Sequence, residues 1–113
     1  MIERRQVKAT IIKELKHVLR NHKGALKEVL DPYWINLATD TIHQSVNNFN
    51  DSWTILANAW NNEILKGKST RKPLPTESMP IGVAGDYVAK LAYDYANKRF
   101  EQLGYDLRLK AKI

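Results

Sequence analysis

Apolar side chains recur at helical spacing from the start of the chain. Between residues 3 and 23 they fall within one arc of a helical wheel, at Val7, Ile11, Ile12, Leu15, Val18 and Leu19. Gly24 follows, and glycine takes the left-handed conformation at a helix end without steric cost. The pattern predicts a helix over about 3–23, with one or two further turns over 25–30.

Asp31 and Pro32 indicate the start of a second helix. Aspartate caps free backbone amides, and proline suits the first helical position, where its missing N–H costs nothing. This helix is predicted over 32–48, with a buried stripe of Ile35, Ala38, Ile42 and Val46. The polar run NNFNDS at 47–52 predicts a break. A third helix is predicted over 52–66, ended by Gly67, with a buried stripe of Trp53, Leu56, Ala57, Trp60 and Ile64.

The next segment is rich in proline and glycine. Three of the four prolines lie between residues 67 and 85, so a connector is predicted there, with residues 79–84 as a short extended piece. Asp86 is expected to cap a fourth helix over 86–103, which Gly104 ends. Its apolar residues cover more than half of its circumference. So wide an arc indicates either the centre of the core or half of a subunit interface.

The last nine residues alternate between apolar and polar side chains, which is typical of a half-buried strand. A strand is predicted over 105–113, and its partner-binding residues are Tyr105, Leu107, Arg108, Leu109, Lys110, Lys112 and Ile113. Within the chain, only residues 79–84 or those before the first helix could pair with it, and neither segment alternates cleanly. The other solution is a strand from a second copy or a different partner.

The predicted fold is therefore a single, mainly α domain over residues 1–113. It has about four helices, a Pro-rich connector and a short carboxyl-terminal β-strand that pairs with a partner or a minor sheet.

The formal net charge is +6, and the charges fall in blocks of alternating sign. Residues 1–30 hold eight Lys and Arg against three acids, residues 31–65 hold four acids and no Lys or Arg, and residues 66–113 hold ten against five. Surfaces of opposite sign can dock copies of a protein on one another. We therefore expect a homo-oligomer, or contacts with other subunits of an assembly.

Basic side chains also suggest a nucleic-acid interface. One face of the first predicted helix is cationic, and the connector begins with a basic stretch that lacks acids. The residues expected to contact phosphates are Arg5, Lys13, Lys16, Arg20, Lys68, Arg71 and Lys72. The alternative is a solvated helix face and a solvated linker, because no aromatic side chain lies on the cationic face for base stacking.

Residue types that exclude or permit particular chemistries are few. Cysteine is absent, which removes disulfides, thiolate zinc sites and cysteine nucleophiles. No apolar run approaches the roughly 20 residues that span a bilayer, and the first residues lack the apolar core of a signal peptide. The chain is expected in the cytoplasm or within an assembled particle, without membrane contact.

Polar residues that could carry catalysis stay isolated. Asp40 and His43 share a helix face, but no second motif supplies the rest of a metal or proton-transfer site. GKST at 67–70 resembles the end of a phosphate-binding loop, yet Asn62 stands where that loop needs its first glycine. We therefore expect no catalytic residues, no metal site and no cofactor.

Two residues depart from the pattern of their helices. Trp34 lies off the main apolar stripe, so it is either an exposed anchor or a cover over segment 25–30. Arg99 lies within the apolar arc of the fourth predicted helix, where an unpaired guanidinium is costly. It must pair with an acid, extend its charged end to solvent, or face a partner.

The sequence alone favours a non-enzymatic structural or assembly protein. It would act by subunit contacts in a homo-oligomer or in a larger, viral-type particle. The alternative is a small basic accessory protein that binds nucleic acid.

Overall fold

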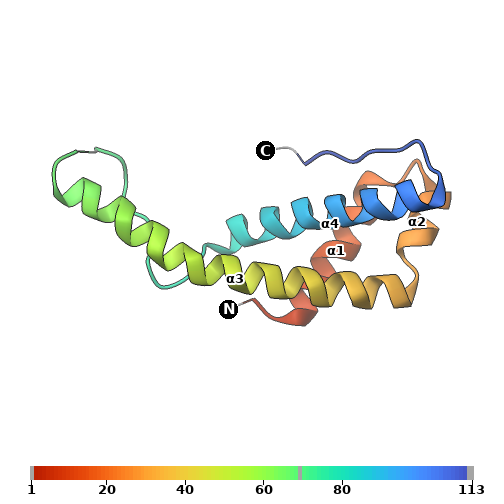
Figure 1. Cartoon of the computed structure of the whole chain (residues 1–113), viewed down its shortest axis with the longest axis horizontal. Coiled ribbons are helices and arrows are strands. Elements are labelled where there is room, and N and C mark those ends of the chain that lie inside the picture. The colour runs from red at the N-terminus through yellow and green to blue at the C-terminus, as the bar shows by residue number, and fades with distance from the viewer. Residues whose placement is uncertain (1, 69, 112–113) are drawn as a thin grey trace.

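The computed structural model describes residues 2–68 and 70–111 and has four helices (Figure 1). These are α1 (Arg4–Val18), α2 (Lys23–Val29), α3 (Pro32–Leu65) and α4 (Ile81–Leu103). α1 packs against both α3 and α4, which also pack on each other, and α2 joins α1 to α3 at one end of the bundle. The mainly helical class is confirmed. The predicted carboxyl-terminal strand is not formed by residues 105–111, and the rest of that prediction, Lys112 and Ile113, lies outside the described residues.

The core is made by the apolar stripes that the sequence predicts. Fully or almost fully buried residues come from α1 (Val7, Ile11, Leu15, with Leu19 after it), from α3 (Ile35, Ala38, Ile42, Val46) and from α4 (Val88, Ala92, Ala96, Phe100). The alanines of α4 let its backbone approach the other helices closely, while Phe100 fills the space near its end. Truncating such a buried phenylalanine to alanine typically costs about 3–5 kcal/mol.

α1 is shorter than the predicted helix over 3–23. The Leu19 N–H closes the last helical turn on the Leu15 carbonyl at 2.9 Å, and the chain then turns, with the His22 N–H donating to the Leu19 carbonyl. The turn lets α2 bury Ala25 and Val29, which a straight continuation would carry away from the core. Gly24 lies inside α2 without a positive φ, so its predicted role as a helix stop is wrong.

α3 is continuous over 34 residues, and the predicted break at 47–52 is wrong. Asn, Asp and Ser lower helix stability by only a few tenths of a kcal/mol each, up to about 0.7. Tertiary contacts outweigh that cost here: the Phe49 ring stacks on Tyr87 with centroids 4.6 Å apart, and Trp53 is 8% exposed. The helix ends as predicted at Gly67, where a φ of 74° accompanies hydrogen bonds from Gly67 and Lys68 back to α3 carbonyls.

α4 begins five residues before the predicted start at Asp86, so the predicted extended piece over 79–84 is mostly helical. Pro80 is its N-cap, and the Ala84 N–H closes the first turn on the Pro80 carbonyl. Gly82 and Gly85 each cost roughly 1 kcal/mol relative to alanine within a helix. The early start buries Met79 and Ala84, which offsets part of that cost.

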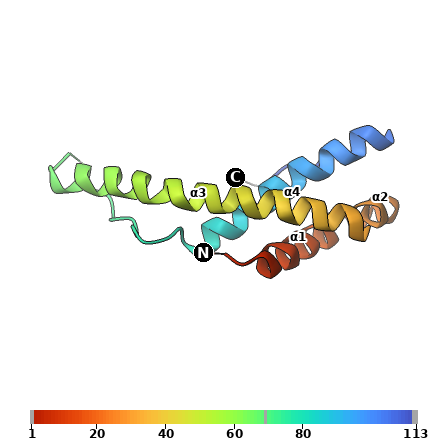
Figure 2. The same cartoon turned by 60° about the horizontal axis from the view of Figure 1, so that its bottom comes forward.

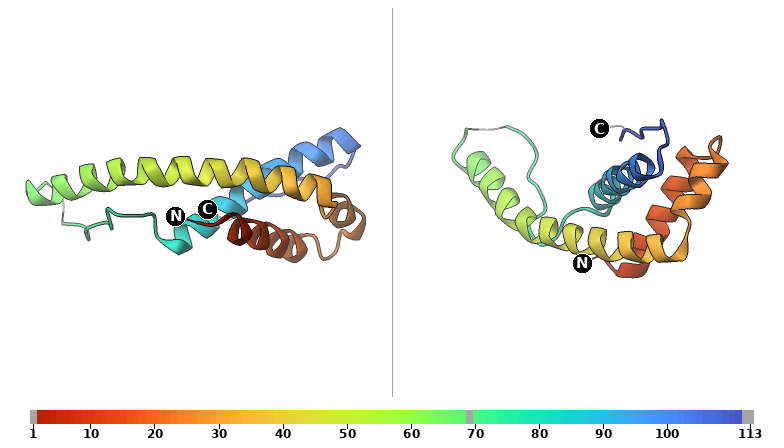
Figure 3. Two further views of the ribbon diagram at one scale, coloured as in Figure 1. Left: turned by 90° about the horizontal axis from the view of Figure 1, so that it is seen from below. Right: turned by 45° about the vertical axis from the view of Figure 1, so that its right-hand side comes forward.

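The far half of α3 projects beyond the bundle (Figures 1 and 2). Residues 66–68 and 70–80, here called the strap, lead from its tip back to α4 (Figure 3). We call α3 from residue 51 onward, together with the strap, the arm. This extension makes the molecule 54 Å long against 24 and 20 Å in the other two directions.

Residues 105–111, here called the tail, return along α4 (Figure 1). Gly104 has a φ of 79°, and the N–H groups of Gly104 and Tyr105 donate to the carbonyls of Glu101 and Phe100. This is the hydrogen-bond pattern of a Schellman motif, and the accompanying apolar contact is the edge-on packing of Tyr105 against Phe100 at 5.9 Å. The alternation of apolar and polar residues in the tail corresponds to an alternation in burial, since Leu107, Leu109 and Ala111 are half-buried against the core.

One side chain of α4 holds the tail in place. The Asn97 carboxamide donates from Nδ2 to the Leu109 carbonyl at 2.8 Å, and its Oδ1 accepts from the Leu109 N–H at 2.7 Å. Among the described tail residues, only Tyr105 and Leu109 make backbone hydrogen bonds. The described tail is therefore covered by helices of its own chain without forming a strand, and a sheet partner for it stays a prediction.

Asn97→Ala should lower the free energy of unfolding by about 1–3 kcal/mol, because it removes two hydrogen bonds and leaves the polar groups of Leu109 unsatisfied. Chemical denaturation measures this loss. In a chain that ends at Gly104, the same substitution should have almost no effect. Asp94→Ala, at an exposed position one turn earlier, is the matched control, and an equal loss in both variants would contradict the role given to Asn97.

Candidate functional site

The strap is held to α3 by another asparagine, in the same way that Asn97 holds the tail to α4. Asn61 donates from Nδ2 to the Leu74 carbonyl at 2.8 Å and accepts from the Leu74 N–H at 2.8 Å. A carboxamide offers one donor and one acceptor edge, so it can complete the hydrogen bonds of an extended residue as a neighbouring strand would. Sequence reasoning missed both clamps. Neither asparagine lies within the apolar arc of its helix, so no local signal marked them.

Further side chains on the same face of α3 bind the strap along its length. The indole N–H groups of Trp53 and Trp60 donate to the carbonyls of Pro75 and Lys72, at 2.8 and 3.0 Å. Near the bundle, Asn50 accepts from the Met79 N–H at 2.8 Å. The polar and aromatic side chains between residues 47 and 62 therefore bind a segment of the same chain, the strap.

The opposite side of the arm carries apolar side chains without cover in this single chain. Ile55 is 75% exposed, Leu56 is 52% exposed, and Ala59 lies beside them in an exposed position. We call these three residues the contact face. Leu56 was predicted to be buried, which is wrong because the strap covers only the face that carries Trp53 and Trp60. Leu65, 83% exposed, adds an apolar side chain near the tip.

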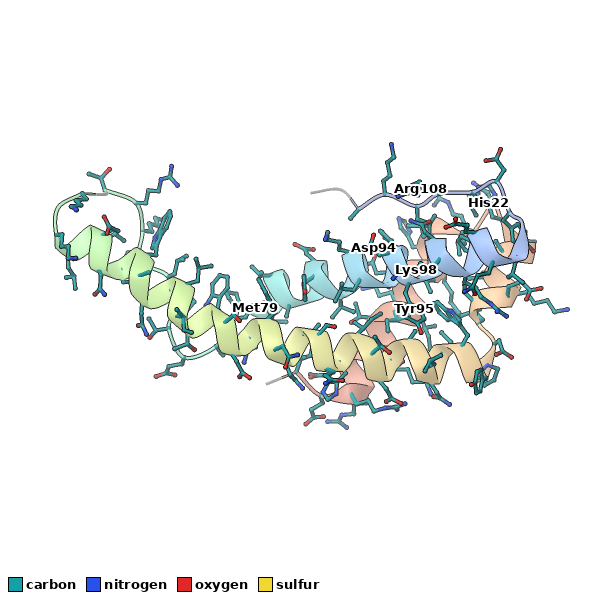
Figure 4. The ribbon with its side chains drawn as sticks, viewed as in Figure 1. His22, Met79, Asp94, Tyr95, Lys98 and Arg108 are labelled. Atoms are coloured by element: carbon teal, nitrogen blue, oxygen red, sulfur yellow. The ribbon has the colours of Figure 1, made fainter. Side chains whose placement is uncertain are left out.

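The predicted strand residues of the tail divide between two environments. Leu107 and Leu109 are half-buried, whereas Tyr105, Arg108 and Lys110 are exposed (Arg108 is labelled in Figure 4). A groove of about 540 Å³ lies between the tail, α1 and α4, and Lys110 lines it together with His17 of α1 and Arg20 in the turn after that helix. Two basic residues that are 90 positions apart are thus brought together.

The seven predicted phosphate-binding residues do not form one surface. Arg5, at the start of α1, forms a salt bridge with Glu3 at 2.6 Å. Lys13 and Lys16 are exposed farther along that helix, and Arg20 is exposed in the turn that follows it. Lys68, Arg71 and Lys72 lie in the strap near the tip of the arm, with the Arg71 guanidinium 5.2 Å from the centre of the Trp60 ring. The structure separates them into an α1 group and an arm group.

The polar face of α3 that carries Asp40 and His43 lies against the amino-terminal residues. Asp40 accepts from Arg4 at 2.6 Å, and the His43 Nε2 lies 3.0 Å from the Ile2 carbonyl. These partners hold the start of the chain against α3. Within residues 2–68 and 70–111, no group of three or more His, Asp or Glu side chains is arranged to hold a metal ion.

Comparison of the chain with protein-family models, curated proteins and solved structures gives no match. In the part of the chain that the structure describes, no helix has both the length and the apolar character needed to cross a membrane.

The fold alters the titration of Tyr93. Tyr93 is 8% exposed on α4, and its hydroxyl donates to the Glu14 carboxylate of α1 at 2.8 Å. Burial, then the hydrogen bond to Glu14, then the negative charge of Glu14 together raise the pKa of Tyr93 to about 12. The pair ties α1 to α4 beside the groove that Arg20 and Lys110 line.

The raised pKa predicts a loss of stability at high pH. An unfolded tyrosine titrates near pH 10, so folding favours the protonated phenol, and this contribution is fully present below about pH 10. It should be lost as the pH rises from there towards 12. Phenolate absorbance should show a tyrosine that titrates late, near pH 12.

Tyr93→Phe should remove this late titration and flatten the fall in stability over the same pH range. Tyr33→Phe, at a 79% exposed position, is the matched control and should leave both unchanged. A late titration that persists in Tyr93→Phe would contradict the assignment.

Proposed function

We propose that the chain is a non-enzymatic structural or assembly protein, which acts through subunit contacts in a homo-oligomer or a larger, viral-type particle. The observation that carries this proposal is the arm. A helix that leaves its own bundle and exposes Ile55 and Leu56 has apolar surface that association would remove from water.

The distribution of charge favours a second copy as the occupant of the contact face. This face belongs to residues 31–65, which contain four acids and no Lys or Arg. The exposed residues Lys13 and Lys16 on α1, and Arg20 just after it, supply the opposite sign on the same molecule. Of the four acids, Asp51 and Glu63 are exposed on the helical line that carries Ile55 and Ala59. A copy whose α1 approaches the contact face of another would bring its cations towards these two acids around an apolar centre, the usual composition of a protein interface.

Ile55→Glu should reduce self-association, because it places a charge at the centre of the contact face. Light scattering coupled to gel filtration, over a wide range of concentrations, should show the wild-type chain gaining mass as concentration rises. The variant should keep the mass of one chain. Gln44→Glu adds the same charge at an exposed position of α3 outside the arm and should behave like the wild type. A wild-type chain that stays a single chain at every concentration would refute the homo-oligomer.

A second candidate function is nucleic-acid binding by the tip of the arm. The observation that favours it is the partly exposed Trp60 beside the arm group of cations, since basic side chains next to an aromatic ring suit a stacked, single-stranded ligand. The α1 group lacks such a ring.

Reversing Lys68 and Lys72 to glutamate should weaken binding to every single-stranded DNA sequence alike and reduce the slope of log affinity against log salt by about 1 for each lost phosphate contact. Fluorescence anisotropy at several salt concentrations measures both effects. Reversing Lys13 and Lys16 gives the same change of net charge on α1. If this control weakens binding as much as the arm variant, or if the wild type does not bind at low salt, the arm is not the interface.

A further inference from the structure

A pocket of about 260 Å³ lies between the start of α3 and the last turns of α4, at the end of the bundle away from the arm. One wall is aromatic: Trp34 and Tyr95 pack with ring centroids 5.4 Å apart and a tilt of 54°. Tyr33 and Leu37 also line the pocket, and they are 79% and 47% exposed. Trp34 itself is only 6% exposed, so its prediction as an exposed anchor is wrong, and the exposed aromatic side chain is its neighbour Tyr33.

Two cations on α4 complete the lining, Lys98 and Arg99 (Lys98 and Tyr95 are labelled in Figure 4). Arg99 makes no hydrogen bond or ion pair within the described part of the chain, and its Nε is buried without an acceptor. A buried donor without an acceptor is costly and calls for an explanation. Because this guanidinium is already partly removed from water, less of its hydration remains to be lost when an anion arrives.

Asp31, the acidic residue that lines the pocket, already has a hydrogen-bond partner within the fold. Asp31 caps α3, where its Oδ2 accepts from the Trp34 N–H at 3.1 Å, and it forms no ion pair with Arg99. A neighbouring hollow of about 710 Å³ shares Asp31 and Arg99 and adds Lys23 and Lys27 to the cations. Even with Glu28 in its lining, positive charge exceeds negative charge around Arg99.

The aromatic wall also has hydrogen-bonding capacity to spare. The indole N–H groups of Trp53 and Trp60 donate to carbonyls of the strap, whereas that of Trp34 has no acceptor among the described residues. Gln102 lines the same pocket and supplies an exposed amide. The pocket therefore joins flat apolar surface to several donors without partners.

We propose that this pocket binds a small planar anion, an aromatic ring that carries a carboxylate or a phosphate group. The ring lies against Trp34 and Tyr95, and the anionic group pairs with Arg99 and Lys98. A guanidinium matches either anion through two parallel hydrogen bonds, and aromatic side chains stabilise a flat ring by offset or edge-on packing. This site stands apart from the arm and does not depend on the proposed assembly function.

The test follows the three indole N–H signals of the ¹⁵N-labelled full chain by NMR during titration with benzoate, phenyl phosphate and the neutral benzyl alcohol. The Trp34 signal should shift and saturate with at least one of the two anions, while those of Trp53 and Trp60 in the arm stay in place. Benzyl alcohol should bind about tenfold more weakly or worse, since it lacks the charge-assisted hydrogen bonds. The tighter of the two anions identifies the anionic group that the site prefers.

Arg99→Met should weaken binding of the preferred anion about tenfold or more. It should leave the melting temperature unchanged or raise it, because it removes a donor that has no partner. If that variant fails to fold, Arg99→Lys is the deciding variant. It keeps the positive charge but lacks the two parallel N–H donors of the guanidinium, so it should also bind the anion more weakly than the wild type. Lys90→Met is the matched control on an exposed part of α4 and should bind like the wild type. Anions that bind no tighter than benzyl alcohol, or affinity that is unchanged in the folded Arg99 variant, would overturn the proposal.

Discussion

The carboxamides of Asn61 and Asn97 hold the two extended segments of this chain against its helices, each through a donor and an acceptor to a single leucine. An extended segment exposes backbone N–H and C=O groups that need partners wherever they leave water. In a sheet a neighbouring strand supplies these partners. Here a helix supplies them from its side chains, so strap and tail can lie on a helical body without a sheet.

The arrangement of the other surfaces depends on these clamps. With the strap fixed to the side of α3 that carries Trp53 and Trp60, the arm has one covered side and one apolar side, which holds Ile55. The tail, fixed on α4, brings Lys110 beside Arg20. The pocket around Arg99 remains open at the far end of the bundle, because neither extended segment reaches it. Association through the arm and binding at the pocket thus use separate parts of the molecule.

Periodicity predicted the helices and the core of the bundle well, because apolar positions at helical spacing must find a common interior. It failed where contacts distant in sequence decide the outcome. NNFNDS has the composition of a break, yet Phe49 stacks on Tyr87 and Asn50 accepts from Met79, and neither contact is visible locally. The tail shows the same limit. A period of two reports only an extended segment with two different sides, and a surface of helices satisfies it as well as a sheet does.

The candidate sites also depend on contacts between residues that are distant in sequence. Arg99 is conspicuous in the sequence, because a cation in an apolar arc needs a reason. Its neighbours in the pocket were not predictable, since Tyr33 and Leu37 come from another helix whose orientation depends on the packing of the whole bundle. The contact face was missed for a related reason: Leu56 fits the buried stripe of its helix until the position of the strap is known.

Amide hydrogen exchange, followed residue by residue by NMR in dilute solution, tests the clamps most directly. Leu74 and Leu109 donate their N–H groups to asparagine side chains, so they should exchange slowly, while Arg108 and Lys110 should exchange at rates close to those of an unstructured peptide. Alternating protection along the whole tail would indicate strand pairing. That result, or fast exchange at Leu74 and Leu109, would contradict a fold in which helical side chains hold the extended segments.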